Sequence, residues 1–176
     1  MHRSLQYTLL FVVLIVLQIF LFGRLDVSIY VNPLVYIAFI ILLPMEIPGA
    51  ALLLLGFLAG VTMDFFTGMA GVNTIATVFA AFCRPVALNY IVGKDEVKEG
   101  GIPNVNSVGL TKFMRYAGII VFLHSAVYFI LESLSWSYFH HVLIRIALSS
   151  VVCLIAVYFV QKFFAVNRQK FRAKSS

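Results

Sequence analysis

Charged side chains are scarce in this sequence of 176 residues. Asp, Glu, Lys and Arg together make up 11% of the chain, against about 25% in ordinary soluble domains. Hydrophobic residues make up 62%, which is more than a soluble core of this size can hide from water, so we expect lipid to surround the chain. A helix needs roughly 20 mostly apolar residues to cross a bilayer, so the length accommodates about six spans and no soluble domain.

Cysteine and histidine are also few, and neither residue type is arranged for chemistry. Cys83 and Cys153 lie in apolar runs without any CxxC spacing, so we interpret both as small buried hydrophobes. The candidate metal ligands would be His124, Glu132, His140 and His141. Adjacent histidines point about 100° apart on a helix, and no H-E-x-x-H pattern occurs. Nucleophile-and-base pairs, phosphate-binding glycine loops and nucleotide fingerprints are absent too, so the sequence predicts no enzyme and no cofactor.

Apolar runs separated by prolines, glycines and polar residues predict an all-α membrane protein with a bundle of about six helices over residues 1–166. The predicted spans are 5–22, 33–45, 49–66, 72–92, 113–131 and 139–164. The first run is longer than a signal-peptide core and no A-x-A-like cleavage site follows it, so we expect it to be retained. Pro33 suits a helix start, and Pro44 and Pro48 predict a reversal. The second span is short, and five spans remain if it only dips into the membrane.

Basic residues gather on one side of this topology. With six spans, the N-terminus, the polar loop 93–112 and the basic tail 167–176 share a side, and 10 of the 13 Lys and Arg residues fall there or at adjoining helix ends. The positive-inside rule predicts that this side, including the C-terminus, is cytoplasmic. The net charge of +6 is therefore mainly an orientation signal. The tail could also lie on anionic lipid, and we expect no nucleic-acid partner.

Small residues and one carboxylate form a stripe in the third span. Gly56, Gly60, Asp64 and Gly68 recur every four residues, so they share one side of the helix. The Gly-x-x-x-Gly spacing lets two helices approach closely. Two interpretations stay open: a docking surface that ends in a carboxylate, or internal packing against later spans.

Charges inside spans are costly and usually face protein or a cavity. A count of about 1.5 Å per residue from the outer face places Asp64, Glu132 and Arg145 in the outer half. We therefore expect an ion pair or a network among these three. Arg84 lies deeper, directly before Pro85. It could bond carbonyls freed by that proline, or extend toward the interface by snorkelling.

The stretch 49–83 resembles the MreD family of rod shape-determining membrane proteins. At its centre lies GFLAGVTMDFFTG, residues 56–68. The family pattern is a glycine-containing span with an aspartate near its end, a short Ser/Thr-Gly link and a Gly-Val start to the next span. Here these positions are Gly60, Asp64, Thr67-Gly68 and Gly71-Val72. Asn32-Pro33 resembles the start of the family's second span, whereas the long 93–112 loop departs from the pattern.

The resemblance implies a non-enzymatic subunit of the elongation (Rod) complex in the bacterial inner membrane. Its principal partner would be MreC, a single-span periplasmic protein, with contacts to MreB, RodA and the class B penicillin-binding protein. The implied fold is similar to the six-helix S-components of energy-coupling-factor vitamin transporters. By this resemblance Gly56, Gly60 and Asp64 would shape the core or a partner groove, and we hypothesise that the Asp64 end supports the MreC contact.

The alternative is a substrate-binding S-component of a vitamin-type transporter. Such subunits dock through alanine-rich small-residue stripes on their first span, but residues 5–17 contain neither alanine nor glycine. The loops also lack the polar and aromatic groups that would hold a water-soluble ligand. A membrane enzyme such as an intramembrane protease would need paired catalytic residues, which the sequence does not offer. The sequence favours the non-enzymatic, partner-binding subunit of the Rod complex over both of these alternatives.

Overall fold

A computed structural model describes residues 2–22, 32–133 and 139–173. All regular elements in these ranges are helical, as expected from the apolar runs. They are α1 (His2–Leu17) with a π-helical turn (Gln18–Phe22), a 3₁₀ turn (Val35–Ile37), α2 (Ala38–Ile41), α3 (Gly49–Thr67), α4 (Val72–Ile91), α5 (Lys94–Glu99), α6 (Val105–Val108), α7 (Leu110–Ser133) and α8 (Phe139–Ala173). Residues 134–138, between the predicted spans 113–131 and 139–164, lie outside the described residues, and α8 continues into the predicted tail.

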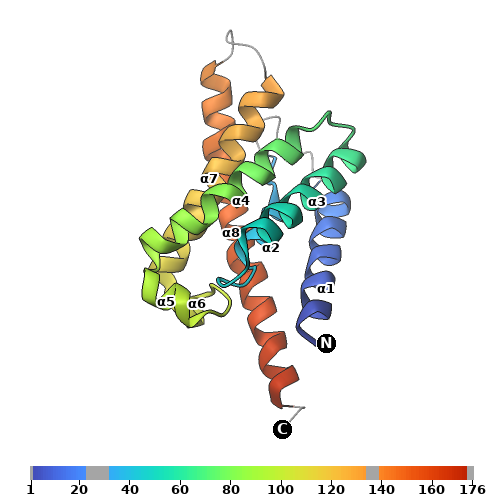
Figure 1. The fold of residues 1–176 in the computed structure, drawn as a ribbon. Helices are drawn as coiled ribbons and strands as arrows, with labels where there is room; N and C mark the ends of the chain where they lie inside the picture. Colours follow the sequence, from blue (N-terminus) through green and yellow to red (C-terminus); the bar gives the residue numbers. More distant parts are fainter. Residues whose placement is uncertain (1, 23–31, 134–138, 174–176) are drawn as a thin grey trace.

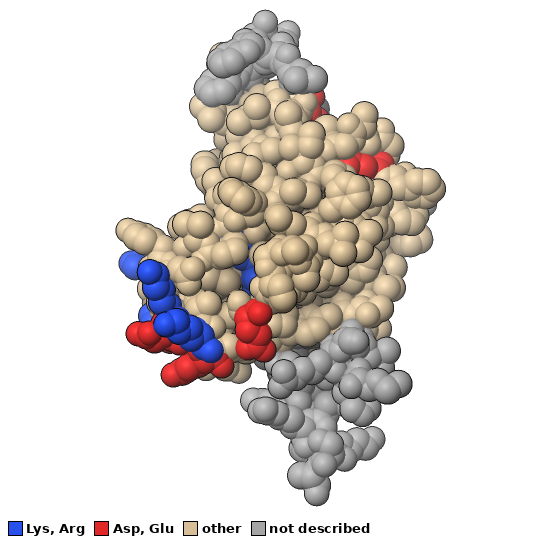
Figure 2. Space-filling model, in the orientation of Figure 1, with Lys and Arg blue, Asp and Glu red and all other residues tan. Residues whose placement is uncertain are grey.

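Four helices are long and apolar enough to cross a membrane. The candidate spans are Gly49–Thr67, Val72–Ile91, Leu110–Ser133 and His140–Phe163. Large apolar side chains on their outer faces are exposed, as lipid-facing residues are, for example Phe65, Val86 and Phe163. On the face drawn in Figure 2, most charged side chains gather near one end of the molecule, and most of the middle carries no charge. The chain is thus an all-helical protein with the features of a multi-span membrane protein.

The long helices pack in chain order. α3 and α4 form an antiparallel hairpin, α4 packs on α7, and α7 packs on α8 (Figure 1). We call the end with the α3–α4 turn (Gly68–Gly71) the hairpin end, and the opposite end, with residues 92–109, the linker end. The linker end holds α5 and α6, and α1 begins and α8 ends on that side (Figure 1). α1 packs against the short helices that follow it.

The predicted span 33–45 does not form a continuous helix. Only residues 35–41 are helical, and seven residues rise about 10 Å, far less than the roughly 30 Å of a hydrocarbon core. Pro33 and Pro44 disfavour helix at the two ends. Instead, residues 32–45, which we call the central segment, run through the interior. Each residue from Leu34 to Leu43 is at most 4% exposed, so other helices of the bundle, rather than lipid, surround this segment.

Candidate functional site

The glycine stripe of α3 faces α4. A Cβ atom on Gly60 would lie 2.4 Å from the Thr74 Cα, and one on Gly56 would lie 3.0 Å from the Ala81 Cβ. Real Cβ atoms do not approach backbone as closely as 2.4 Å, so at Gly60 the two helices meet at a distance that only glycine permits, and the contact at Gly56 is also tight. Of the two interpretations of the stripe, internal packing is the one that the structure shows at Gly56 and Gly60.

Asp64 caps the start of α4. Its Oδ1 accepts hydrogen bonds from the Asn73 backbone N–H and side-chain amide, both at 3.0 Å. Its Oδ2 accepts from the Thr74 N–H at 2.9 Å and the Thr74 hydroxyl at 2.5 Å. The first N–H groups of a helix have no partner inside it, and the helix dipole favours a negative charge there. The N-cap position is Gly71, which has no side chain, so a carboxylate from the preceding helix takes this role.

The turn between α3 and α4 depends on two glycines. Gly68 (φ +69°) ends α3 and Gly71 (φ +89°) precedes α4, both in the left-handed region that L side chains rarely adopt. The N–H groups of Gly68 and Met69 both donate to the Asp64 carbonyl. Asp64 therefore closes the turn with its backbone and its side chain.

A buried polar cluster joins the central segment to α4 and α7. It consists of Tyr36, Asn73, Thr77 and His124, none more than 1% exposed. The Tyr36 hydroxyl lies 3.1 Å from Asn73 Oδ1, 3.0 Å from Thr77 Oγ1 and 2.9 Å from His124 Nε2. His124 Nδ1 has no partner among the described atoms. Because Asn73 also bonds Asp64, the cluster continues into the α3–α4 hairpin.

Gln18 holds the start of the central segment. Its side-chain oxygen accepts from the Val35 N–H at 2.7 Å and the Tyr36 N–H at 3.3 Å. Its side-chain amide donates to the Pro33 carbonyl at 3.1 Å. Backbone N–H and C=O groups outside regular helices need such partners at membrane depth, because no water is available there to bond them.

Arg84 holds the other end. Its guanidinium donates to the Leu43 carbonyl and, at 3.3 Å, to the Pro44 carbonyl. Its Nε donates to the Tyr116 hydroxyl at 2.9 Å, which in turn donates to the Ile41 carbonyl at 3.0 Å. The side chain is 1% exposed, so it does not snorkel. Its carbonyl partners belong to the central segment rather than to α4 near Pro85, which corrects the predicted partners.

Glu132 and Arg145 form an ion pair between α7 and α8, with 3.0 Å between Arg145 Nη1 and Glu132 Oε2. The guanidinium also lies 4.7 Å from the centre of the Phe129 ring. Asp64 does not take part, because its oxygens are used by Asn73 and Thr74. The structure thus joins two of the three residues predicted to form a network.

These polar groups bond either one another or the chain's own backbone. Among the described residues no group of three His, Cys, Asp or Glu side chains is placed to hold a metal ion. His124 bonds a tyrosine and a threonine, and neither bond pairs it with a carboxylate or a nucleophilic thiol. The cluster can hold three elements in register.

Several of these residues were not singled out from the sequence: Gln18, Tyr36, Asn73, Thr77 and Tyr116. The available signal was weak. Gln18 interrupts an apolar run, and Asn73 and Thr77 share one side of a helix at a spacing of four. No protein-family model, curated protein or solved structure matches the chain.

Proposed function

We propose that the chain is a non-enzymatic scaffold subunit of the MreD type in a bacterial inner membrane. In this role it binds MreC and supports cell-shape control and peptidoglycan elongation by the Rod complex, with RodA, the class B penicillin-binding protein and MreB as further direct or indirect partners. In the proposed orientation, which follows the positive-inside rule, the linker end faces the cytoplasm.

The observation that carries this proposal is the structural role of the residues in the MreD-like pattern. Gly60 permits the close approach of α3 and α4, Asp64 caps α4, and Gly68 and Gly71 form the turn. The residues that carry the resemblance thus build one structural unit, the α3–α4 hairpin. A pattern that shapes a hairpin suits a protein that presents a surface to partners.

The filled interior also supports a scaffold over a vitamin-binding subunit. A small-molecule site is a cleft or cavity that buries most of its ligand. Here the central segment occupies the space between α4, α7 and α8, and its residues from Val35 to Ala38 are fully buried. The side chains of Gln18, His124 and Arg84 hydrogen-bond to that segment, so these polar groups are used to hold the chain itself.

The outer face of α3 is the surface we propose for MreC. α3 packs on α4 along its glycine stripe and leaves exposed apolar side chains on the other side: Leu54, Phe57, Leu58, Val61 and Phe65. A single transmembrane helix could pack along this face. Phe65, 81% exposed and next to Asp64, lies near the hairpin end, which faces the periplasm in the proposed orientation.

Co-purification with the MreC of the same genome tests the proposal. We expect Phe65→Ala to reduce co-purified MreC several-fold, because it removes an exposed aromatic contact without touching the core. Phe159→Ala, at a 65% exposed position on α8, is the matched control and should retain MreC. Asp64→Ala should also reduce MreC by disturbing the hairpin.

Two results would contradict the proposal at different levels. Failure of the unaltered chain to retain MreC would overturn the scaffold assignment. Retention of MreC that is equal in the Phe65→Ala, Asp64→Ala and Phe159→Ala variants would overturn the α3 surface and leave the partner in place.

A further inference from the structure

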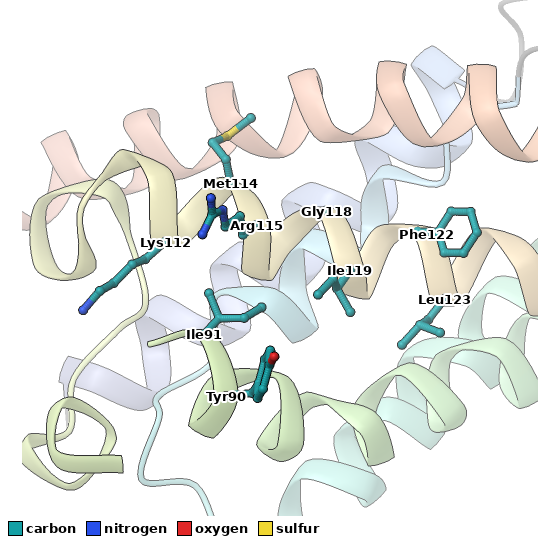
Figure 3. Close-up of a pocket in the computed structure, with 9 residues that line it drawn as sticks. All are labelled: Tyr90, Ile91, Lys112, Met114, Arg115, Gly118, Ile119, Phe122 and Leu123. Atoms are coloured by element: carbon teal, nitrogen blue, oxygen red, sulfur yellow. The ribbon is translucent and has the colours of Figure 1, made fainter. Parts of the chain in front are cut away.

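A groove with a volume of about 560 Å³ lies between the end of α4 and the first half of α7. Tyr90 and Ile91 of α4 form one side, and α7 provides the other lining residues (Figure 3). Those from α7 are Lys112, Met114, Arg115, Gly118, Ile119, Phe122 and Leu123. None of these residues belongs to the buried polar cluster or to the proposed MreC surface.

The lining is charged at one end only. Lys112 and Arg115 lie in the first two turns of α7, near the linker end, and the positions beyond them along the groove are Gly118, Ile119 and Phe122 (Figure 3). The Lys112 ammonium is paired with the Glu96 carboxylate. The exposed Arg115 guanidinium has no such pair in the described part of the chain, so it supplies the free positive charge.

Gly118 has no packing reason to be glycine. A Cβ atom there would meet only Leu154 Cδ2 at 3.9 Å, which is ordinary van der Waals contact. Glycine inside a helix costs about 1 kcal/mol relative to alanine. Gly56 and Gly60 offset that cost with close contact to α4, but Gly118 instead leaves the groove open beside Arg115.

We propose that this groove binds one anionic phospholipid. The phosphate bonds Arg115, with Lys112 beside it, and one acyl chain lies along Gly118, Ile119 and Phe122. Basic pockets between transmembrane helices at the membrane surface suit anionic headgroups, and Tyr90, 88% exposed at the same level, is a residue type that favours the headgroup zone. The site requires only that α4 and α7 cross the bilayer, and it is independent of the scaffold function.

Native mass spectrometry of the detergent-solubilised full chain tests this proposal with phosphatidylglycerol and phosphatidylcholine as probes. We expect one retained phosphatidylglycerol and weaker retention of phosphatidylcholine. Arg115→Gln should weaken phosphatidylglycerol binding roughly fivefold, the factor that corresponds to about 1 kcal/mol per basic residue. Lys98→Gln makes the same charge change on α5, outside the groove, and should leave binding unchanged.

Gly118→Leu tests the apolar half of the groove. The added side chain should occupy the acyl-chain path and abolish the retained lipid, while Gly118→Ala, which fits the available space, keeps the fold as a reference. Equal retention by the unaltered chain, Arg115→Gln and Gly118→Leu would overturn the proposal, as would equal retention of the two lipids. Displacement of phosphatidylglycerol by millimolar inorganic phosphate would also overturn it in favour of a free-anion site.

Discussion

The α3–α4 hairpin and the central segment satisfy their backbone polar groups in opposite ways. In the hairpin, two regular helices satisfy most of their own groups, and Asp64 caps α4 from a position nine residues before Asn73. In the central segment, only residues 35–41 are helical, so side chains from other helices form hydrogen bonds with backbone groups of the remaining residues. Gln18 and Arg84 do so at the two ends. The hairpin is therefore locally determined, whereas the central segment depends on the assembled bundle.

Among the changes that test this comparison, removal of Arg84 should lower the free energy of unfolding the most. Arg84→Met keeps an apolar stem but leaves the Leu43 and Pro44 carbonyls and the Tyr116 hydroxyl without their donor. Each unsatisfied buried group costs about 1–3 kcal/mol, so we expect a loss of about 3 kcal/mol in the free energy of unfolding. Unfolding in detergent, followed by tyrosine and tryptophan fluorescence, measures it. Lys98→Met, at an exposed position on α5 outside the groove, is the control, and equal stability of the two variants would refute the role of Arg84.

Removal of the Asp64 carboxylate should have the next largest effect. Asp64→Ala leaves the Asn73 and Thr74 N–H groups unpaired, and loss of an N-cap costs about 0.5–2 kcal/mol. We expect a loss near the upper end, about 2 kcal/mol, because the charge also faces the helix dipole. Asp64→Asn should recover part of it, since the amide oxygen can still accept. Hydrogen exchange at the Asn73 and Thr74 amides should accelerate in Asp64→Ala, and unchanged exchange there would contradict the cap.

The two kinds of helical glycine offer a sharper contrast. Gly60→Ala places a Cβ atom 2.4 Å from the Thr74 Cα, so the helices must separate, and overpacking of this kind costs about 1–3 kcal/mol. Gly118→Ala meets only Leu154 at 3.9 Å and should be neutral or stabilise α7 by up to about 1 kcal/mol. Thermal unfolding of both variants in the same detergent compares them directly. Equal melting temperatures would mean that α3 and α4 do not pack as closely as the structure has them.

The sequence predicted the hairpin far better than the central segment, and the reason is physical. Apolar runs and glycine spacing are local signals, so α3, α4 and the close-packing pattern were predictable from residues 49–92. The central segment has side-chain partners between 15 and 119 residues away along the chain. No local signal says that Arg84 bonds Leu43. Proline at both ends indicated a short element, but a helix pattern could not reveal that it would be threaded through the bundle.

The partners of Asp64 were likewise not predictable from the sequence pattern. Its depth was predicted by counting along α3, and Arg145 was a reasonable partner by depth alone. The true partners lie only nine and ten residues away, across a turn. The signal was an absence: α4 begins after Gly71 with no Ser, Thr, Asp or Asn at its N-cap, so its first N–H groups had to find an acceptor elsewhere.

The smallest expected loss of stability concerns the buried polar cluster, where the hairpin and the central segment meet. Tyr36→Phe removes the hydroxyl that bonds Asn73, Thr77 and His124, and hydrogen bonds between transmembrane helices contribute about 0.6 kcal/mol on average and at most about 1.7. We expect a loss of about 1 kcal/mol in the unfolding free energy. Tyr128→Phe is the matched control, because Tyr128 is 3% exposed and its hydroxyl has no hydrogen bond in the described part of the chain.

A double-mutant cycle then asks whether the hairpin and the central segment are coupled. Asn73 bonds both Asp64 and Tyr36, so Tyr36→Phe should cost less when Asp64→Asn has already loosened Asn73. Residues in one hydrogen-bond network show interaction energies of about 0.5–3 kcal/mol, whereas independent sites add within about 0.3–0.5. Additive losses would mean that the buried polar cluster does not transmit the state of the hairpin to the central segment.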